Sequence, residues 1–179
     1  IPHSPKHPEG LNFRNTIVGF RAPVLGFSQG MYQALPEFGI KYDTTQQNKP
    51  AYWPTQKLGG VWDFPLASIA RPGSGRTLPS MDYNFCYSDT KTLLQTDPAL
   101  KSYAAPGGKP NTNSECLTSI RPEQKVQVKN TMMTMYMNYF NNNYYGNRAP
   151  VSIGHHFSKW MSGAYYETFF EFADKVCNL

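Results

Sequence analysis

The order of short apolar runs near the start of this sequence constrains its fold most. Residues 16–20 read as a buried strand that ends before Pro23, because proline cannot continue a central ladder. Ser28 is typical of a helix N-cap, and apolar residues at helical spacing follow it. Residues 40–42 read as the next strand. The order strand, helix and strand predicts a parallel βαβ unit.

The rest of the chain continues this alternation with long insertions. Residues 61–66 read as a third strand, and Pro122 opens a long helix that Gly146 closes. Residues 149–153 read as a fourth strand and residues 164–176 as a final amphipathic helix. We therefore expect an α/β fold, either a parallel layer or a barrel, with functional residues at the carboxyl ends of its strands. The 179 residues suit a single domain spanning 1–179.

Charge and hydropathy exclude several classes of protein. Lys and Arg number 17 against 12 Asp and Glu, which gives a net charge of +5, but the basic residues are scattered and form no cluster. No nucleic acid partner is therefore predicted, and an RNA-binding α/β domain remains only the third interpretation. The chain has no run of about 18 apolar residues, so no membrane span is predicted.

The three cysteines bear on the cellular compartment. Their spacing lacks a Cys-x-x-Cys pair, which argues against a cysteine zinc site. Cys86 and Cys116 flank a polar stretch, residues 97–114, that a disulfide would pin, although three buried thiols are the alternative. Cys177 is the odd cysteine, and its partner could lie outside the chain. A disulfide would favour a secreted or periplasmic protein.

Charged and imidazole side chains follow the predicted strands. Arg21 follows the first strand, Asp43 the second, and His155 and His156 the last. An arginine, a carboxylate and a histidine on one rim would suit a hydrolytic site. Because adjacent residues of an extended segment point to opposite sides, at most one histidine is expected to face a cleft. The aromatic residues around the pair, which would suit the apolar face of a sugar ring, are Phe157, Trp160, Tyr165 and Tyr166.

A second pair of histidines lies near the N-terminus. His3 and His7 have the spacing of a two-histidine metal motif. Pro5 between them and Pro8 after them oppose a helix that would bring both onto one face. A proline-rich irregular segment with incidental histidines is therefore the preferred interpretation over a metal site.

Six short motifs follow one another in a fixed order along the chain. They are Phe-Arg-Ala-Pro-Val-Leu-Gly at 20–26, Lys-Tyr-Asp-Thr-Thr at 41–45, Trp-Pro at 53–54, Trp-Asp-Phe-Pro at 62–65, Asn-Arg-Ala-Pro at 147–150 and His-His-Phe at 155–157. This ordered set resembles the C-terminal half of the polysaccharide deacetylase family, in particular its chitin deacetylase-like branch. The resemblance runs from about residue 16 to the last predicted helix.

This resemblance implies a distorted, incomplete (β/α) barrel with long loop insertions, of which residues 1–179 form the C-terminal portion. The family removes acetyl groups from N-acetylglucosamine units, so the implied function is a metal-dependent N-deacetylase acting on chitin or peptidoglycan. The implied partners are that polysaccharide and the missing N-terminal half of the same domain. A non-catalytic, deacetylase-like glycan-binding domain is the alternative function.

The resemblance also implies roles for individual residues. Arg21 would hold the carboxylate that acts as general base, and His156 would be the general acid that protonates the leaving amine. Asp82 would be the carboxylate that keeps this histidine charged, with Asp63 as the competing candidate. The implied substrate-binding residues are Pro23, Trp53, Trp62, Trp160 and Tyr83.

The sequence departs from the family at the motifs that bind the metal. It has no strand ending in paired aspartates, and no helix with two histidines upstream of Arg21. The implied cofactor is a divalent metal, with zinc the leading candidate, and its ligands are expected upstream of this chain. Among the residues present, only His3 and His7 have the family's spacing, and we expect no metal on this chain.

Overall fold

The structure is a computed structural model that describes residues 17–97, 99–100 and 115–179. The chain divides into two compact units, residues 1–48 with 52–66 and residues 49–51 with 67–179. The single domain expected over residues 1–179 stays a prediction.

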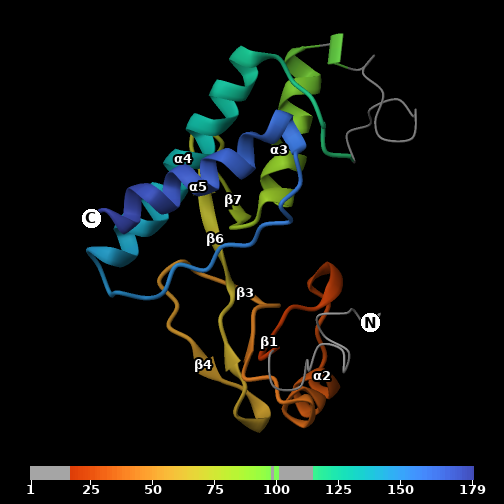
Figure 1. Ribbon diagram of the computed structural model, residues 1–179, viewed down its shortest axis with the longest axis vertical. Coiled ribbons are helices and arrows are strands. Elements are labelled where there is room, and N and C mark those ends of the chain that lie inside the picture. Colours follow the sequence, from red (N-terminus) through yellow and green to blue (C-terminus); the bar gives the residue numbers. More distant parts are fainter. Residues whose placement is uncertain (1–16, 98, 101–114) are drawn as a thin grey trace, which may run out of the picture. The chain divides into compact units, whose positions relative to one another are not determined.

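The first unit is built on a four-stranded sheet with the strand order β1-β2-β5-β4 (Figure 1). β1 (Gly19–Phe20), β2 (Tyr42–Asp43) and β5 (Trp62–Asp63) run parallel, with Phe20 beside Asp43 and Asp43 beside Asp63. β4 (Thr55–Gln56) pairs antiparallel with β5. The predicted parallel βαβ unit is confirmed.

A short helix connects the first two strands of this sheet. α2 (Gln29–Ala34) begins after Ser28, whose Oγ accepts a hydrogen bond from the Met31 N–H, as the sequence predicts. A 3-10 turn (Leu35–Phe38) follows and ends at Gly39, which adopts a left-handed φ of 76° that favours glycine. The remaining short elements of this unit are η1 (Pro23–Leu25), β3 (Gln47–Asn48) and η3 (Leu58–Gly60).

The second unit starts with an antiparallel hairpin that the sequence analysis missed. β6 (Leu66–Arg71) pairs with β7 (Arg76–Pro79), and Gly73 and Gly75 adopt left-handed φ values in the turn between them. The prediction of a single strand over residues 61–66 was wrong. Pro65 separates β5 from β6, because a proline has no N–H for a sheet ladder.

Three helices enclose the main apolar core of the second unit. They are α3 (Asp82–Thr96), α4 (Pro122–Tyr144) and α5 (Ala164–Cys177), and a 3-10 turn η5 (Trp160–Gly163) leads into α5. α4 and α5 lie side by side (Figure 1). The predicted starts of α4 at Pro122 and of α5 at Ala164 are confirmed, whereas α3 was not predicted.

The segment of residues 149–153 is not a strand, so this prediction was wrong. Gly154 makes one isolated parallel bridge to Met81, and side chains bind the backbone before it. The Ser152 N–H donates to the Tyr139 hydroxyl, and the Ser152 carbonyl accepts from the Ser80 hydroxyl. Pro150 removes a further donor, so the segment cannot build a regular ladder.

The fold is therefore mixed α/β, with parallel and antiparallel strands. No closed barrel forms among the described residues, and the barrel of the deacetylase type stays a prediction. In the part of the chain that the structure describes, no helix is both long enough and apolar enough to cross a membrane.

Candidate functional site

The centre of the candidate site is a hydrogen-bonded pair formed by Asp82 and His156. Asp82 Oδ1 lies 2.6 Å from His156 Nδ1, and Asp82 Oδ2 accepts a hydrogen bond of 2.8 Å from the His156 backbone N–H. The carboxylate is 1% exposed, whereas the imidazole is 47% exposed. One buried carboxylate thus fixes both the backbone and the ring of a solvent-facing histidine.

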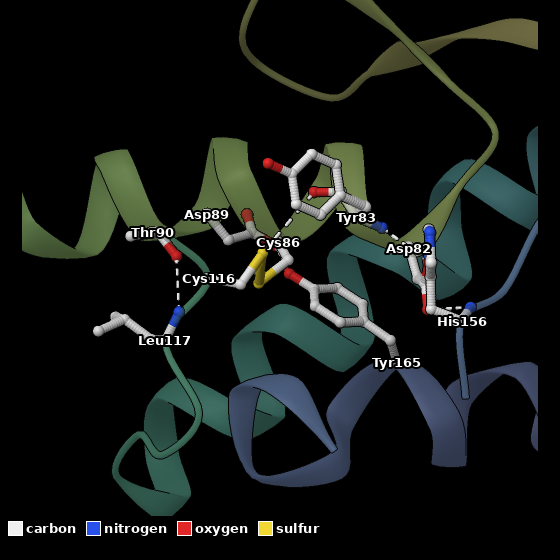
Figure 2. The surroundings of a disulfide bond; sticks show 9 residues. All are labelled: Asp82, Tyr83, Cys86, Asp89, Thr90, Cys116, Leu117, His156 and Tyr165. Carbon is white, nitrogen blue, oxygen red and sulfur yellow. Dashed lines mark hydrogen bonds and ion pairs between the residues drawn. A yellow bond between two sulfur atoms is a disulfide. The ribbon is translucent and has the colours of Figure 1, made fainter. Parts of the chain in front are cut away.

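The start of α3 positions this carboxylate. Asp82 is the first residue of the helix, where its Oδ1 accepts a hydrogen bond of 2.7 Å from the Tyr83 N–H. A carboxylate in a first helical turn satisfies free backbone donors and is favoured by the helix dipole. The Asp82 N–H donates to the Gly154 carbonyl, which brings α3 against the chain that carries His156 (Figure 2).

His155 lies beside the same carboxylate in a different environment. Its side chain is 3% exposed, and its Nδ1 lies 3.6 Å from Asp82 Oδ2. Burial lowers the pKa of His155, which Asp82 offsets in part. Its Nε2 lies 3.0 Å from the Tyr136 hydroxyl, and burial raises the pKa of that hydroxyl. The acceptor-only Asp82 carboxylate near Nδ1 favours the neutral tautomer with its proton on Nδ1, in which the Tyr136 hydroxyl donates to Nε2.

Two aromatic rings flank the exposed imidazole. The ring centroids of Tyr83 and Trp160 lie 6.1 Å and 5.5 Å from that of His156, and 5.7 Å from each other. Phe157 contacts the His155 ring instead. The structure thus brings together four of the predicted site residues, His156, Asp82, Tyr83 and Trp160.

Tyr165 does not belong to the aromatic rim around the histidines. It is fully buried, and its hydroxyl donates a hydrogen bond of 2.5 Å to Asp89 Oδ2. Asp89 also forms an ion pair with Arg71, while burial raises the pKa of its carboxyl. This buried cluster holds the hairpin, α3 and α5 together, which is a structural role.

The Cys86–Cys116 disulfide lies about one helical turn along α3 from Asp82 (Figure 2). It ties Cys86 of α3 to the segment that begins at residue 115. In that segment the Leu117 N–H donates to the Thr90 hydroxyl, and the Leu117 carbonyl accepts from the Met161 N–H at 2.8 Å. The disulfide thereby connects α3 to the turn that carries Trp160. Cys177 is free and exposed.

Three other predicted residues lie on the surface of the first unit. Trp53 and Trp62 are both exposed, and Pro23 is exposed at the start of η1. Pro23, Trp53 and Trp62 are thus assigned to one unit and His156 to the other. Their grouping around one substrate stays a prediction.

Arg21 also lies in the first unit, where Thr44 binds it. Its Nε donates to the Thr44 hydroxyl at 2.9 Å and to the Thr44 carbonyl at 3.2 Å. Asp43 is buried and accepts hydrogen bonds from the Tyr32 hydroxyl at 3.0 Å and the Thr45 hydroxyl at 2.6 Å. The predicted role of Arg21 in holding a catalytic base stays a prediction.

Asp63, the competing partner for the histidine, is buried beside Lys57. Lys57 Nζ lies 3.1 Å from Asp63 Oδ2, while burial raises the pKa of the carboxyl. The hydrogen bonds of His156 go to Asp82. Of the two carboxylates that the sequence analysis named, Asp82 therefore has the geometry required.

A metal ion does not fit the described residues. Within residues 17–97, 99–100 and 115–179, no group of three or more His, Cys, Asp or Glu side chains could hold one. The imidazole nitrogens nearest to Asp82 face its carboxylate. His3 and His7 lie outside the described residues.

Sequence reasoning missed the helix that positions Asp82, although its start signal is present. An aspartate stands before apolar residues at helical spacing, which is a recognised helix start. The opposite environments of His155 and His156 were anticipated. The chain matches no protein-family model, no curated protein and no solved structure.

Proposed function

We propose that this chain supplies the proton-donating side of a polysaccharide N-deacetylase, a hydrolase that removes acetyl groups from N-acetylglucosamine units of chitin or peptidoglycan. The observation that carries the proposal is the buried Asp82 carboxylate on the exposed His156 imidazole, 2.6 Å apart. This arrangement orients a histidine for acid–base chemistry in many hydrolases.

His156 acts as the general acid in this proposal. Asp82 holds Nδ1, so Nε2 faces away from the carboxylate, and it has no hydrogen-bond partner among the described residues. When the C–N bond of the tetrahedral intermediate breaks, the leaving nitrogen takes the proton from Nε2, and the product is a free amine. Asp82 is a positioning residue that stabilises the ring while it carries charge.

The aromatic rings provide a surface for the sugar. Tyr83 and Trp160 flank His156, and flat π surfaces pack well against the apolar C–H face of a pyranose ring. A sugar on these rings would hold its N-acetyl group beside the imidazole. The disulfide supports a secreted or periplasmic location, where such polysaccharides are found.

A metal ion is part of this proposal but not of the described site. When bound, a zinc ion would polarise the acetyl carbonyl and activate water. The described residues do not form its ligand set, so the proposal requires ligands elsewhere in the natural protein.

The test measures acetate released from N-acetylglucosamine oligomers by the natural full-length protein. We expect His156→Ala to lower kcat by about 10²- to 10⁴-fold, with little change in KM, because it removes a proton donor used in the transition state. Asp82→Asn should lower kcat as well. Tyr145→Phe is the matched control, since Tyr145 is exposed on the same unit at the C-terminal end of α4 and contacts none of the site residues.

Circular dichroism would show that each variant is folded. Unchanged turnover in His156→Ala would reject the general acid. A wild-type protein that binds the oligomers but releases no acetate would instead indicate the alternative, a non-catalytic glycan-binding domain.

A further inference from the structure

A hollow on the surface of the second unit shares Trp160 with the candidate site. Its volume is about 590 Å³, and Trp160 lines it. The ring centroid of Trp160 lies 5.5 Å from that of His156, so Trp160 belongs both to the hollow and to the surroundings of the imidazole. The other lining residues are Thr118, Ser119, Ser158, Lys159 and Ser162.

The polar side chains of this hollow are available to a ligand. Within the described residues, the hydroxyls of Thr118, Ser119 and Ser158 have no hydrogen-bond partner. The Ser162 hydroxyl differs, because it is bound to the backbone of Ile120. Three free hydroxyls beside an indole suit a sugar, which presents many hydroxyls and an apolar face.

Lys159 gives the hollow a positive charge. No Asp or Glu side chain lines it, and Lys159 has no ion pair within the described part of the chain. An ammonium group without a carboxylate partner, at the edge of a hydroxyl-rich hollow, is suited to an anionic group on the ligand.

The turn that forms the hollow has an unusual backbone conformation. Met161 and Ser162 adopt φ values of 51° and 56°, which side-chain-bearing residues rarely occupy. Their N–H groups donate to the carbonyls of Leu117 and Thr118, at 2.8 Å and 2.9 Å. Backbone of this kind persists where surrounding contacts hold it, and it concentrates at binding sites.

We propose that this hollow, the Lys159 subsite, binds a sugar unit that carries a carboxylate and adjoins the unit at His156. Lys159 pairs with the carboxylate, the free hydroxyls bind the sugar hydroxyls, and Trp160 packs on the ring. This inference rests on the proposed function and deepens it. It selects a glycan whose alternate units are acidic, such as the peptidoglycan strand with its lactyl carboxylates, over neutral chitin.

The experiment measures equilibrium binding of three tetrasaccharides by calorimetry, with no metal added. The first is a peptidoglycan glycan tetrasaccharide, the second is the same compound with its carboxylates converted to methyl esters, and the third is a neutral chitin tetrasaccharide. The proteins are the wild type, Lys159→Gln and the matched control Lys175→Gln. Lys175 is exposed on α5, so its variant makes the same change in net charge outside the hollow.

We expect the wild type to bind the acidic tetrasaccharide about tenfold more tightly than its ester, which is the effect of one charge-assisted hydrogen bond. Lys159→Gln should remove this preference and leave the other two affinities within about twofold, whereas Lys175→Gln should keep it. Equal affinity of the wild type for acid and ester, equal effects of the two substitutions, or no binding at all would overturn the subsite.

The same proteins distinguish a failure of the Lys159 subsite from a failure of the proposed deacetylase function. Acidic preference without acetate release by the full-length protein would keep the subsite and reject the deacetylase. Acetate release that is indifferent to the carboxylate would keep the deacetylase and reject the subsite.

Discussion

At the scale of single residues, the Asp82 carboxylate lies next to two histidine side chains that differ in exposure. Asp82 Oδ1 holds the exposed His156, and Oδ2 faces the buried His155. Two charged imidazoles beside one carboxylate would repel each other, and burial disfavours the charge on His155. Neutral His155, fixed by Tyr136, therefore acts as a rigid support behind the histidine that faces solvent.

The lowered pKa of His155 predicts a pH dependence of stability. The unfolded state takes up a proton near pH 6.5, whereas folded His155 does so only at lower pH. Below about pH 6.5 the unfolded state thus binds more protons, and the free energy of unfolding falls with falling pH by up to about 1.4 kcal/mol per pH unit. The groups that face the ring are Asp82, His156 and Tyr136.

Urea unfolding between pH 7.5 and 5 would measure this slope. In His155→Gln the contribution should vanish, so the slope should become shallower even if the variant is less stable throughout. Lys175→Gln is the control, because Lys175 is exposed on α5 and is not one of the groups that face the His155 ring. A slope that His155→Gln leaves unchanged would show that other groups cause it.

At the scale of elements, α2 depends on its cap more than the longer helices do. It has six residues, and a helix of this length is unstable in isolation. The Ser28 hydroxyl accepts from the Met31 N–H at 3.2 Å and satisfies one of the free donors at the helix start. Tyr32 and Leu35 of this region form the small core of the first unit with Val61.

We therefore expect Ser28→Ala to lower the free energy of unfolding by about 1 kcal/mol. Ser28→Gly should cost only a few tenths, since glycine is tolerated at this position. Amide hydrogen exchange would localise the change to α2 and β2. Equal losses in both variants, or exchange that increases in α4 instead, would contradict the assignment of the cap.

At the scale of the whole molecule, the disulfide ties together parts that are far apart in the sequence. Cys86 and Cys116 are separated by 30 residues. Closing a loop of this size in the unfolded chain is worth about 3–4 kcal/mol in the chain-entropy treatment. The segment after Cys116 also holds the turn of Trp160, so the disulfide stabilises the candidate site as well as the fold.

Cys116→Ser should lower the free energy of unfolding by about 2–4 kcal/mol and weaken binding of glycans at Trp160. Cys177→Ser is the matched control and should change neither, because Cys177 is free and exposed. Urea unfolding and calorimetry would measure both effects. Loss of stability without any change in glycan binding would show that the turn keeps its conformation without the disulfide.

The sequence alone determined the features that depend on residues close to one another along the chain. Ser28 and Pro122 set helix starts through local backbone chemistry, and both are where the sequence predicts them. The prediction of a strand at residues 149–153 was wrong, because the backbone of Ser152 forms hydrogen bonds with the hydroxyls of Ser80 and Tyr139, which are distant in the sequence. Propensity and periodicity carry no information about such contacts.

For the candidate site, the sequence supplied the residue types and the tertiary structure supplied their pairing. The resemblance made Asp82 the expected partner of the histidine and left Asp63 as the competing candidate. Only packing decided between them. The bridge from Met81 to Gly154 places α3 against His156, across a separation of 74 residues, whereas Asp63 is buried beside Lys57. Hydrogen bonds between distant residues depend on the folded core, which no local pattern encodes.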